Sequence, residues 1–236
     1  MYITLVIVGL IAGIISGSVG FGGAMILLPV ITYFYGVEIA IPVSTIAQLM
    51  SNLSRALMGR KDIQWKQVGW FLIPALPFTA LGAFSFSVIN KVLMTRLLCI
   101  FLIIFSIMKI CGKIHLKGGR KTMLIGGGVT GLISGMLGIS GPLSSAVFLS
   151  LNLAPVAYIA SKATASAAMH IVKAVIYNKF GLMNWDIFLN GLFIGCAMMA
   201  GNFVAMRLIR HAHKKVYPSI VAGVMIAVSI WLFVSI

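Results

Sequence analysis

Long apolar stretches decide the solvent in which this chain folds. They cover residues 68–85, 92–110, 187–206 and 217–236. Each approaches the roughly 20 residues that a helix needs to cross a hydrocarbon core about 30 Å thick. In lipid the backbone must satisfy its own hydrogen bonds, so a spanning segment is a helix or part of a closed barrel. Barrel strands alternate apolar and polar residues, and these stretches do not. The sequence therefore predicts an all-α polytopic membrane protein.

Composition and charge support this prediction. Of the 236 residues, 61% are hydrophobic and 9% are charged, whereas soluble domains are roughly 25% charged. So short a chain cannot bury that much apolar surface in one water-soluble core. The net charge of +15 comes largely from three short clusters between apolar stretches, at 60–66, 109–121 and 207–215. This distribution is typical of cytoplasmic loops, whereas a nucleic-acid binder needs a basic face on a folded domain. We expect a lipid bilayer as partner and no nucleic acid.

The two halves of the chain repeat each other. A shift of 118 residues aligns about 50 positions without a gap, and after a two-residue insertion near Gly181 it also matches Trp65 with Trp185. Five small residues of the first half meet the same residue types in the second half: Gly13, Ser16, Gly17, Gly20 and Gly23 meet Gly131, Ser134, Gly135, Gly138 and Gly141. Because repeats are the signature of a duplicated architecture, we divide the chain into a first repeat (1–112), a basic cytoplasmic linker (113–120) and a second repeat (121–236).

Each repeat is predicted to hold five helical elements. In the first half they cover 2–18, 23–36, 39–60, 67–86 and 90–110, and in the second half 121–137, 141–153, 156–178, 185–207 and 214–235. An odd number of elements makes the second repeat enter the membrane in the opposite orientation. If the 109–121 loop is cytoplasmic, the other two basic loops lie on the same side, while both termini and the loops near Lys91 and Lys179 lie outside. The positive-inside rule agrees with these inverted repeats.

The second element of each repeat is too short to span the membrane. About 13 residues at 1.5 Å each reach roughly 20 Å. Glycine-rich loops precede these elements, at 19–23 and 137–142. We expect each pair of first elements to form a broken or re-entrant hairpin whose loop lies at membrane depth, where irregular backbone must be buried or line a cavity.

Two matched stripes of polar residues follow the hairpins. They comprise Ser44, Gln48, Asn52 and Arg55 in the first half, and Lys162, Ser166, His170 and Lys173 in the second. A spacing of three or four residues places each set on one helical face, and that face should point into the bundle because lipid penalises polar groups. Asn52 and His170 lie nearest the span centres; interhelical hydrogen bonding is the alternative role for both. Arg55, Lys162 and Lys173 either attract anions inside or extend to the headgroups.

These motifs resemble those of a known transporter family. The opening GLIAGIISGSVGFGGAMILLPV, its repeat GLISGMLGISGPL and the IQW and MNW segments are similar to the TauE/SafE family, also called the sulfite exporter or toluene-sulfonate uptake permease family. The resemblance covers essentially the whole chain. The second-half motif departs from the double glycine of the first half, because Ser140 stands at the position that matches Gly22. It implies a secondary transporter of sulfite, organosulfonates or related small anions in a prokaryotic plasma membrane.

The chemistry of the hairpins points to an anion site. The helices that follow the two loops start at membrane depth, where Ser140 or Gly141 is a candidate N-cap and Pro142 suits the first turn. Helix N-termini offer backbone donors and positive potential to an anion, as in transporters with broken helices. The alternative is close helix packing by small residues, which we favour for Gly13 and Gly131. The candidate substrate-binding residues are Gly20, Phe21, Gly22, Gly23, Gln48, Asn52, Gly138, Ile139, Ser140, Gly141, Ser166 and His170. Arg55, Lys162 and Lys173 are candidates for charge attraction.

The acidic residues are few and lie at predicted span edges. Glu38, Asp62 and Asp186 are the only three, so no buried carboxylate relay is expected. If a proton is the coupling ion, His170 is the mid-span group whose unperturbed pKa lies near neutrality.

The sequence favours one of four possible functions. We expect an alternating-access carrier of a small sulfur-containing anion; a passive anion channel with the same site is the alternative. A membrane enzyme would need a nucleophile–base pair, an HExxH motif or paired intramembrane carboxylates, and the sequence has none of them. A scaffold would need a soluble interaction domain. We expect no catalytic residue, cofactor or metal site, and the oligomeric state is left open.

Overall fold

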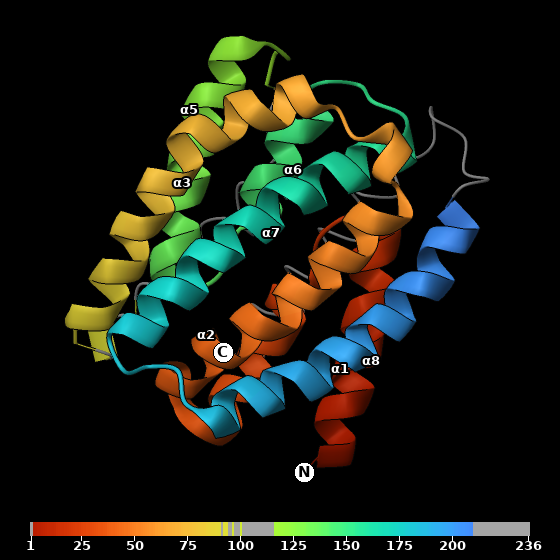
Figure 1. Ribbon diagram of the computed structural model, residues 1–236. Coiled ribbons are helices and arrows are strands. Elements are labelled where there is room, and N and C mark those ends of the chain that lie inside the picture. Colours follow the sequence, from red (N-terminus) through yellow and green to blue (C-terminus); the bar gives the residue numbers. More distant parts are fainter. Residues whose placement is uncertain (1, 91, 94–95, 97–99, 101–115, 210–236) are drawn as a thin grey trace.

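The apolar stretches fold into helices that cross one another in a bundle (Figure 1). The computed structural model describes residues 2–90, 92, 93, 96, 100 and 116–209. Within these residues the helices are α1 (Tyr2–Val19), α2 (Gly23–Met58), α3 (Trp65–Val88), α5 (Arg120–Leu137), α6 (Gly141–Leu149), α7 (Pro155–Lys179) and α8 (Trp185–Ile209), with a 3-10 turn at Arg60–Asp62. The predicted elements at 90–110 and 214–235 lie outside the described residues.

Three of the described helices are long and apolar enough to cross a membrane. They are α2, α3 and the segment Trp185–Arg207 of α8, with mean hydropathies of 1.9, 1.7 and 1.7. Large apolar side chains such as Ile73, Leu81 and Phe193 lie exposed on their outer faces, where lipid is the solvent that such faces need. The prediction of a helical, multi-pass membrane protein is confirmed at this level.

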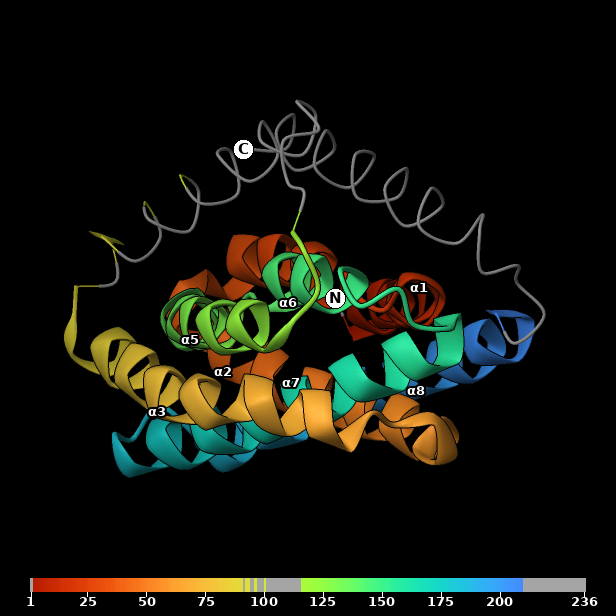
Figure 2. The ribbon, with the colours of Figure 1, turned by 90° about the horizontal axis from the view of Figure 1, so that it is seen from above.

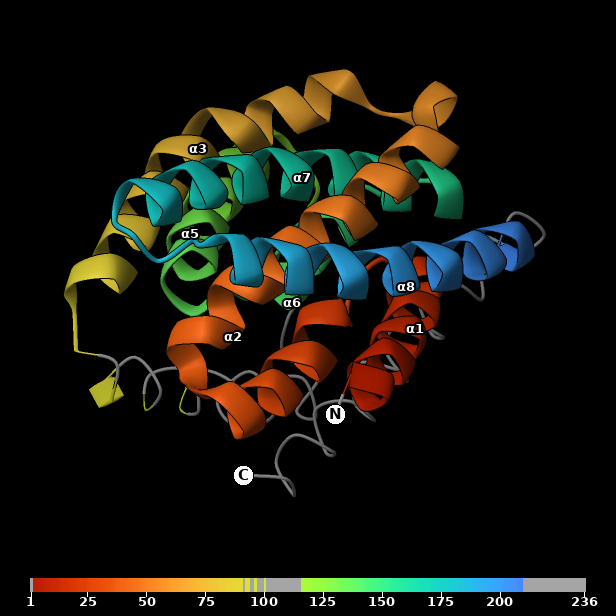
Figure 3. The same ribbon diagram turned by 60° about the horizontal axis from the view of Figure 1, so that its bottom comes forward.

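Helix α2 contains the break that the sequence places between two elements. It runs for 36 residues, and Gly36 alone departs from helical geometry, with φ 75° and ψ 163°. Glycine adopts this left-handed region without a Cβ penalty. The bend is visible in Figure 3, where α2 reverses its course. The predicted gap between residues 36 and 39 is therefore wrong, because one glycine makes the break. The part at 23–36 remains short, about 20 Å at 1.5 Å per residue.

Helix α6 is shorter than the sequence predicts. It spans 9 residues and ends at Leu149, whereas the expected element extends to residue 153. Asn152 follows in the left-handed region with φ 50°, a conformation that ends helices. Pro155 then begins α7, and Ala154 before it is extended, as a residue preceding proline prefers. Helix α6 reaches about 14 Å at 1.5 Å per residue and cannot span.

Glycines set the closest helix contacts in both halves. In α5, Cβ atoms added to Gly127, Gly131 and Gly135 would meet the carbonyl oxygens of α3. In α1, Gly9, Gly13 and Gly17 approach the backbone of α8 in the same way. Small residues at every fourth position let membrane helices approach closely. The packing role that the sequence favours for Gly13 and Gly131 is therefore confirmed.

These contacts organise the helices into two layers. Figure 2 shows α1, α5, α6 and the first part of α2 on one side, with α3, α7 and α8 on the other. Under the 118-residue shift α1 corresponds to α5, and after the insertion α3 corresponds to α8. The observed pairs α1–α8 and α3–α5 thus correspond to each other, because the first helix of each half packs on the fourth helix of the other half.

The second part of α2 and α7 run in opposite directions (Figure 1). Gly59, just after α2, lies against Ala160 near the start of α7. The backbone N–H of Gln64 donates to Ser161 Oγ at 2.8 Å. The end of one stripe-bearing helix therefore meets the beginning of the other. This is the relation that inverted repeats require; the full five-helix repeats remain a prediction, because the fifth elements fall outside the described residues.

Candidate functional site

A small buried cavity lies where the two short helices begin. Its open volume is about 10 Å³, roughly the room needed by one water molecule. Thirteen residues line it: Ser16, Phe21, Gly22, Gly23, Ala24, Met25, Gln48, Asn52, Arg55, Ser140, Gly141, Lys162 and Ser166. Both Gly-rich loops and both polar stripes thus contribute to one cavity, as the sequence predicts for a shared site.

The two helix starts meet at this cavity. A Cβ on Gly141, the first residue of α6, would lie 3.2 Å from Phe21 Cβ and 3.6 Å from the Gly22 amide nitrogen. The N-cap residues are Gly22 for α2 and Ser140 for α6, and neither makes a side-chain cap hydrogen bond. The first N–H groups of a helix have no intrahelical partner. The starts of α2 and α6 therefore bring backbone donors to the cavity without a capping side chain.

Ser140 fits where its repeat partner is glycine, because the two backbones differ. Gly22 has φ 105°, in the left-handed region, whereas Ser140 has φ −110°, which any residue adopts. The Ser140 carbonyl accepts the amide of Ser144 at 3.1 Å and its hydroxyl at 2.7 Å. Position 140 is the N-cap, as the sequence suggests, but its hydroxyl does not cap the helix.

Arg55 extends from α2 into the interior. It is 3% exposed, which excludes the alternative that it extends to the headgroups. Its Nη1 donates to the Ser16 carbonyl and its Nη2 to Asn52 Oδ1, each at 2.7 Å, and its Nε donates to the Ser51 carbonyl at 3.3 Å. These three acceptors are neutral oxygens, and they hold the guanidinium at the cavity.

Lys162 brings a second cation to the cavity from α7. It is 2% exposed, and its Nζ donates to the Gly20 carbonyl at 2.6 Å. Gly20 follows α1 with φ 84°, and a Cβ there would overlap the ring of Tyr158. Gly20 therefore holds Lys162 through its carbonyl, although it does not itself line the cavity.

The cavity is electropositive, with no acidic residue to balance it. The chain's three acidic residues, Glu38, Asp62 and Asp186, are all exposed. Two buried cations and two helix starts therefore face the same cavity. Positive side chains and helix N-termini both attract negative charge, so this cavity favours an anionic guest.

Neutral polar groups complete the lining. Gln48 Nε2 and Ser166 Oγ are buried and have no hydrogen-bond partner within the described residues. Asn52 Nδ2 donates to the Gln48 carbonyl at 2.7 Å, and its Oδ1 accepts from Arg55. Buried polar groups are normally satisfied. The free donor of Gln48 and the hydroxyl of Ser166 are thus available to a bound ligand.

Two candidates on α7 lie outside the cavity lining. His170 and Lys173 are both 0% exposed, so their stripe faces inward as predicted and Lys173 does not extend to the headgroups. They do not line the cavity. His170 Nδ1 and Nε2 and Lys173 Nζ have no hydrogen-bond partner in the described part of the chain.

The remaining two candidates have packing positions. Gly138 ends α5 with φ 75°, and a Cβ there would meet Ile41 at 3.3 Å and Leu28 at 3.4 Å. Ile139 is fully buried but does not line the cavity.

Three lining residues were absent from the sequence-based candidates. Ser16 lines the cavity from α1, and Ala24 and Met25 follow Gly23 in the first turn of α2. Ser16 was detectable as a matched small residue of the repeat. Ala24 and Met25 were detectable as carriers of free N–H groups, since these belong to the first four positions of a helix.

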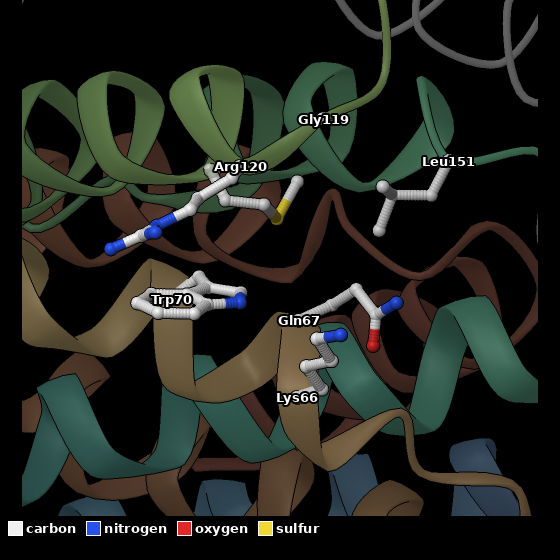
Figure 4. Close-up of a pocket in the computed structure, with 7 residues that line it drawn as sticks. Lys66, Gln67, Trp70, Gly119, Arg120 and Leu151 are labelled. Atoms are coloured by element: carbon white, nitrogen blue, oxygen red, sulfur yellow. The ribbon is translucent and has the colours of Figure 1, made fainter.

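A larger hollow of about 400 Å³ lies elsewhere, between the beginnings of α3 and α5. Figure 4 shows Arg120 above the ring of Trp70, with Lys66 and Gln67 beside them; the guanidinium carbon is 3.9 Å from the ring centroid. Three of its lining residues, Lys66, Gly119 and Arg120, belong to the predicted basic loops. This hollow has neither the buried cations nor the converging helix starts of the cavity.

Metal-binding groups do not cluster in the part of the structure that is described. Within those residues no three His, Cys, Asp or Glu side chains lie close enough to hold an ion. The chemistry that the cavity offers is hydrogen-bond donation and positive charge, which suit a small oxyanion.

Comparison with known proteins identifies the family. The family model described as sulfite exporter TauE/SafE matches residues 5–232. No curated protein and no solved structure gives a significant match. Members of this family are membrane transporters of the sulfite-exporter type, in accord with the apolar helices and the electropositive cavity. With nearly its whole length matched, the chain belongs to the sulfite exporter TauE/SafE family.

Proposed function

We propose that this protein is a secondary active transporter of a small sulfur oxyanion or organosulfonate, which it moves by alternating access around the buried cavity. One observation carries the proposal: two uncapped helix starts and two buried cations, Arg55 and Lys162, surround one cavity without an acidic residue. Small sulfur oxyanions present several acceptor oxygens on a compact charge. Such a ligand fits a shell made of donors.

The helix starts supply part of the attraction. A helix N-terminus carries roughly half a positive charge and is worth about 0.3–1 kcal/mol to an anion at an exposed site, and about 2 kcal/mol in buried geometry. Backbone N–H groups at Gly23 and Gly141 come from two different helices, α2 and α6, and both residues line the cavity. Anion sites between half-helices recur in transporters.

The two cations supply the larger part. At 4 Å, an effective dielectric constant of 20 gives about 4 kcal/mol for each pair of unit charges, before the cost of desolvating the anion. Arg55 and Lys162 now donate to the carbonyls of Ser16 and Gly20. An incoming oxyanion would compete with these neutral acceptors and win, because bonds between charged partners are roughly twice as strong.

The size of the cavity favours a carrier over a channel. A channel needs a wide path that stays hydrated, whereas a carrier holds its substrate in a site that closes. The cavity has room for about one water molecule, with an open volume of about 10 Å³. It is therefore closed around its own side chains, and binding must open it.

We further propose that the basic loops face the cytoplasm of a prokaryotic cell. Arg60 and Lys61 lie in the α2–α3 connection, Lys66 lies in the first turn of α3, and Arg120 and Lys121 begin α5. Positive residues near span ends remain on the cytoplasmic side. Inverted repeats would then place both chain termini outside.

The test is transport by the purified protein in proteoliposomes. We expect [35S]sulfite to enter by exchange against internal sulfite, and Lys162→Gln to lower exchange and sulfite affinity at least 30-fold, as loss of one buried charge partner worth about 2 kcal/mol or more implies. Lys179→Gln, an exposed lysine at the end of the same helix, is the matched control and should resemble the parent. Parental affinity in Lys162→Gln would refute the site. Sulfite currents far above carrier turnover would show a channel.

A further inference from the structure

The polar stripe on α7 continues beyond the cavity. Lys162 and Ser166 line it, and His170 and Lys173 follow one and two turns further along the same face. Both side chains are 0% exposed and have no hydrogen-bond partner among the described residues. A buried ammonium without a partner is costly, and the chain has no buried acidic residue that could compensate it.

The repeat shows what these two residues correspond to. The 118-residue shift pairs His170 with Asn52 and Lys173 with Arg55. In the first half, Arg55 donates to the Ser16 carbonyl at 2.7 Å. Ser16 corresponds to Ser134, which is also fully buried. The second half therefore holds a matching set of residues, but the bonds of the first half are not formed.

The matching set occupies one region of the bundle. Tyr177 lies one turn beyond Lys173 on α7, and its hydroxyl donates to the Gly135 carbonyl at 2.9 Å. Gly135 is the chain neighbour of Ser134. Residues four apart share a helical face, so this bond brings the Lys173 face of α7 against the end of α5 that carries Ser134.

Ser134 lacks a partner for an identifiable reason. Ser16 Oγ donates to Asn202 Oδ1 at 3.2 Å in the first half. With the insertion included, Asn202 corresponds to Gly82, which packs on the α5 backbone and has no side chain to offer. Ser134 Oγ consequently has no hydrogen-bond partner within the described residues.

We propose that Ser134, His170 and Lys173 form a second position for a small oxyanion, occupied when the carrier faces the other side of the membrane. The inference rests on the proposed transport function. The helix starts at Gly23 and Gly141 serve both positions, because they line the cavity from which the α7 stripe continues. The anion leaves Arg55 and Lys162 and is received by His170 and Lys173, while Gln48 and Ser166 lie between. The structure thus represents one of two states, with the first position assembled.

Two measurements on the full-length protein separate the positions. Equilibrium binding of [35S]sulfite to purified protein reports the position assembled here, and sulfite exchange in proteoliposomes requires both. Lys173→Gln should bind sulfite within threefold of the parent yet exchange it at least tenfold more slowly. Lys173→Arg, which keeps the charge, should recover at least a third of the exchange rate. Lys179→Gln should match the parent in both measurements.

His170→Ala provides a second variant, since it removes a buried group that makes no hydrogen bond here and leaves Lys173 intact. It should retain binding and slow exchange at least threefold. Parental exchange in both Lys173→Gln and His170→Ala would overturn the second position. So would a loss of binding in Lys173→Gln equal to that of Lys162→Gln, because it would assign Lys173 to the first position. Unchanged binding in Lys162→Gln would instead refute the proposed site.

Discussion

Replacing Gly131 by alanine should separate α5 from α3. A Cβ at this position would overlap the Ala75 carbonyl oxygen and lie 3.0 Å from Ala75 Cα and C. Carbon contacts are favourable at about 3.5–4.0 Å, so the helices must part by roughly 0.5–1 Å. A gap of this size forfeits a quarter to a half of the dispersion attraction of each contact. Overpacking of this kind costs about 1–3 kcal/mol.

The same substitution has one favourable effect. Alanine is better than glycine in a helix by about 1 kcal/mol, so the net loss for Gly131→Ala should be about 0–2 kcal/mol. Gly128 on the same helix is the matched control. A Cβ there would lie 3.6–3.7 Å from Phe78 and Pro74, which are ordinary contacts. Gly128→Ala should therefore gain up to about 1 kcal/mol.

The assay is reversible unfolding in mixed micelles titrated with a denaturing detergent. It yields the free energy of unfolding for the parent and the two variants. We expect Gly131→Ala to lie about 1–3 kcal/mol below Gly128→Ala, because both variants gain the helix propensity of alanine and only Gly131→Ala is overpacked. Two variants within about 0.5 kcal/mol of each other, the usual range for surface substitutions, would refute the reasoning that backbone contact limits position 131.

Three further outcomes follow from the contacts. Asn202→Leu removes donation to the Ser51 carbonyl and Ser51 Oγ, at 3.0 and 2.9 Å, and should lower the free energy of unfolding by about 0.6–1.7 kcal/mol in the same assay. Tyr177→Phe loses the bond to the Gly135 carbonyl and should cost about 1 kcal/mol; an unchanged melting curve would contradict that bond. Arg120→Gln alters the surface hollow only, so sulfite affinity measured by equilibrium binding should stay within twofold, and a larger loss would assign the hollow to the site.

The inward orientation of the polar stripes could be predicted from the sequence. Ser44, Asn52, Lys162 and His170 recur at helical spacing within apolar segments, and lipid penalises polar groups strongly enough to fix their orientation. The structure buries all four. The glycines of α1 and α5 were predictable for a related reason, since close packing in membranes selects small residues.

The position of the cavity along the stripes could not be predicted. The repeat suggests a symmetric site, but the structure assembles the Arg55 and Lys162 ends and leaves His170 and Lys173 aside. The repeat pairs residues by sequence position, and this pairing does not say which members of the two stripes line one cavity. The end of α6 was missed because Asn152 stops the helix through its backbone conformation, which hydropathy does not report.

The lack of spare room between α2 and α6 has a consequence for selectivity. With an open volume of about 10 Å³, no guest larger than a water molecule finds a ready-made slot. Affinity for any ion is therefore the gain from its own contacts minus the work of drawing Arg55 from Ser16 and Lys162 from Gly20. We expect ions whose oxygens replace both lost bonds to bind tightly, and halides, which offer a single centre, to bind weakly.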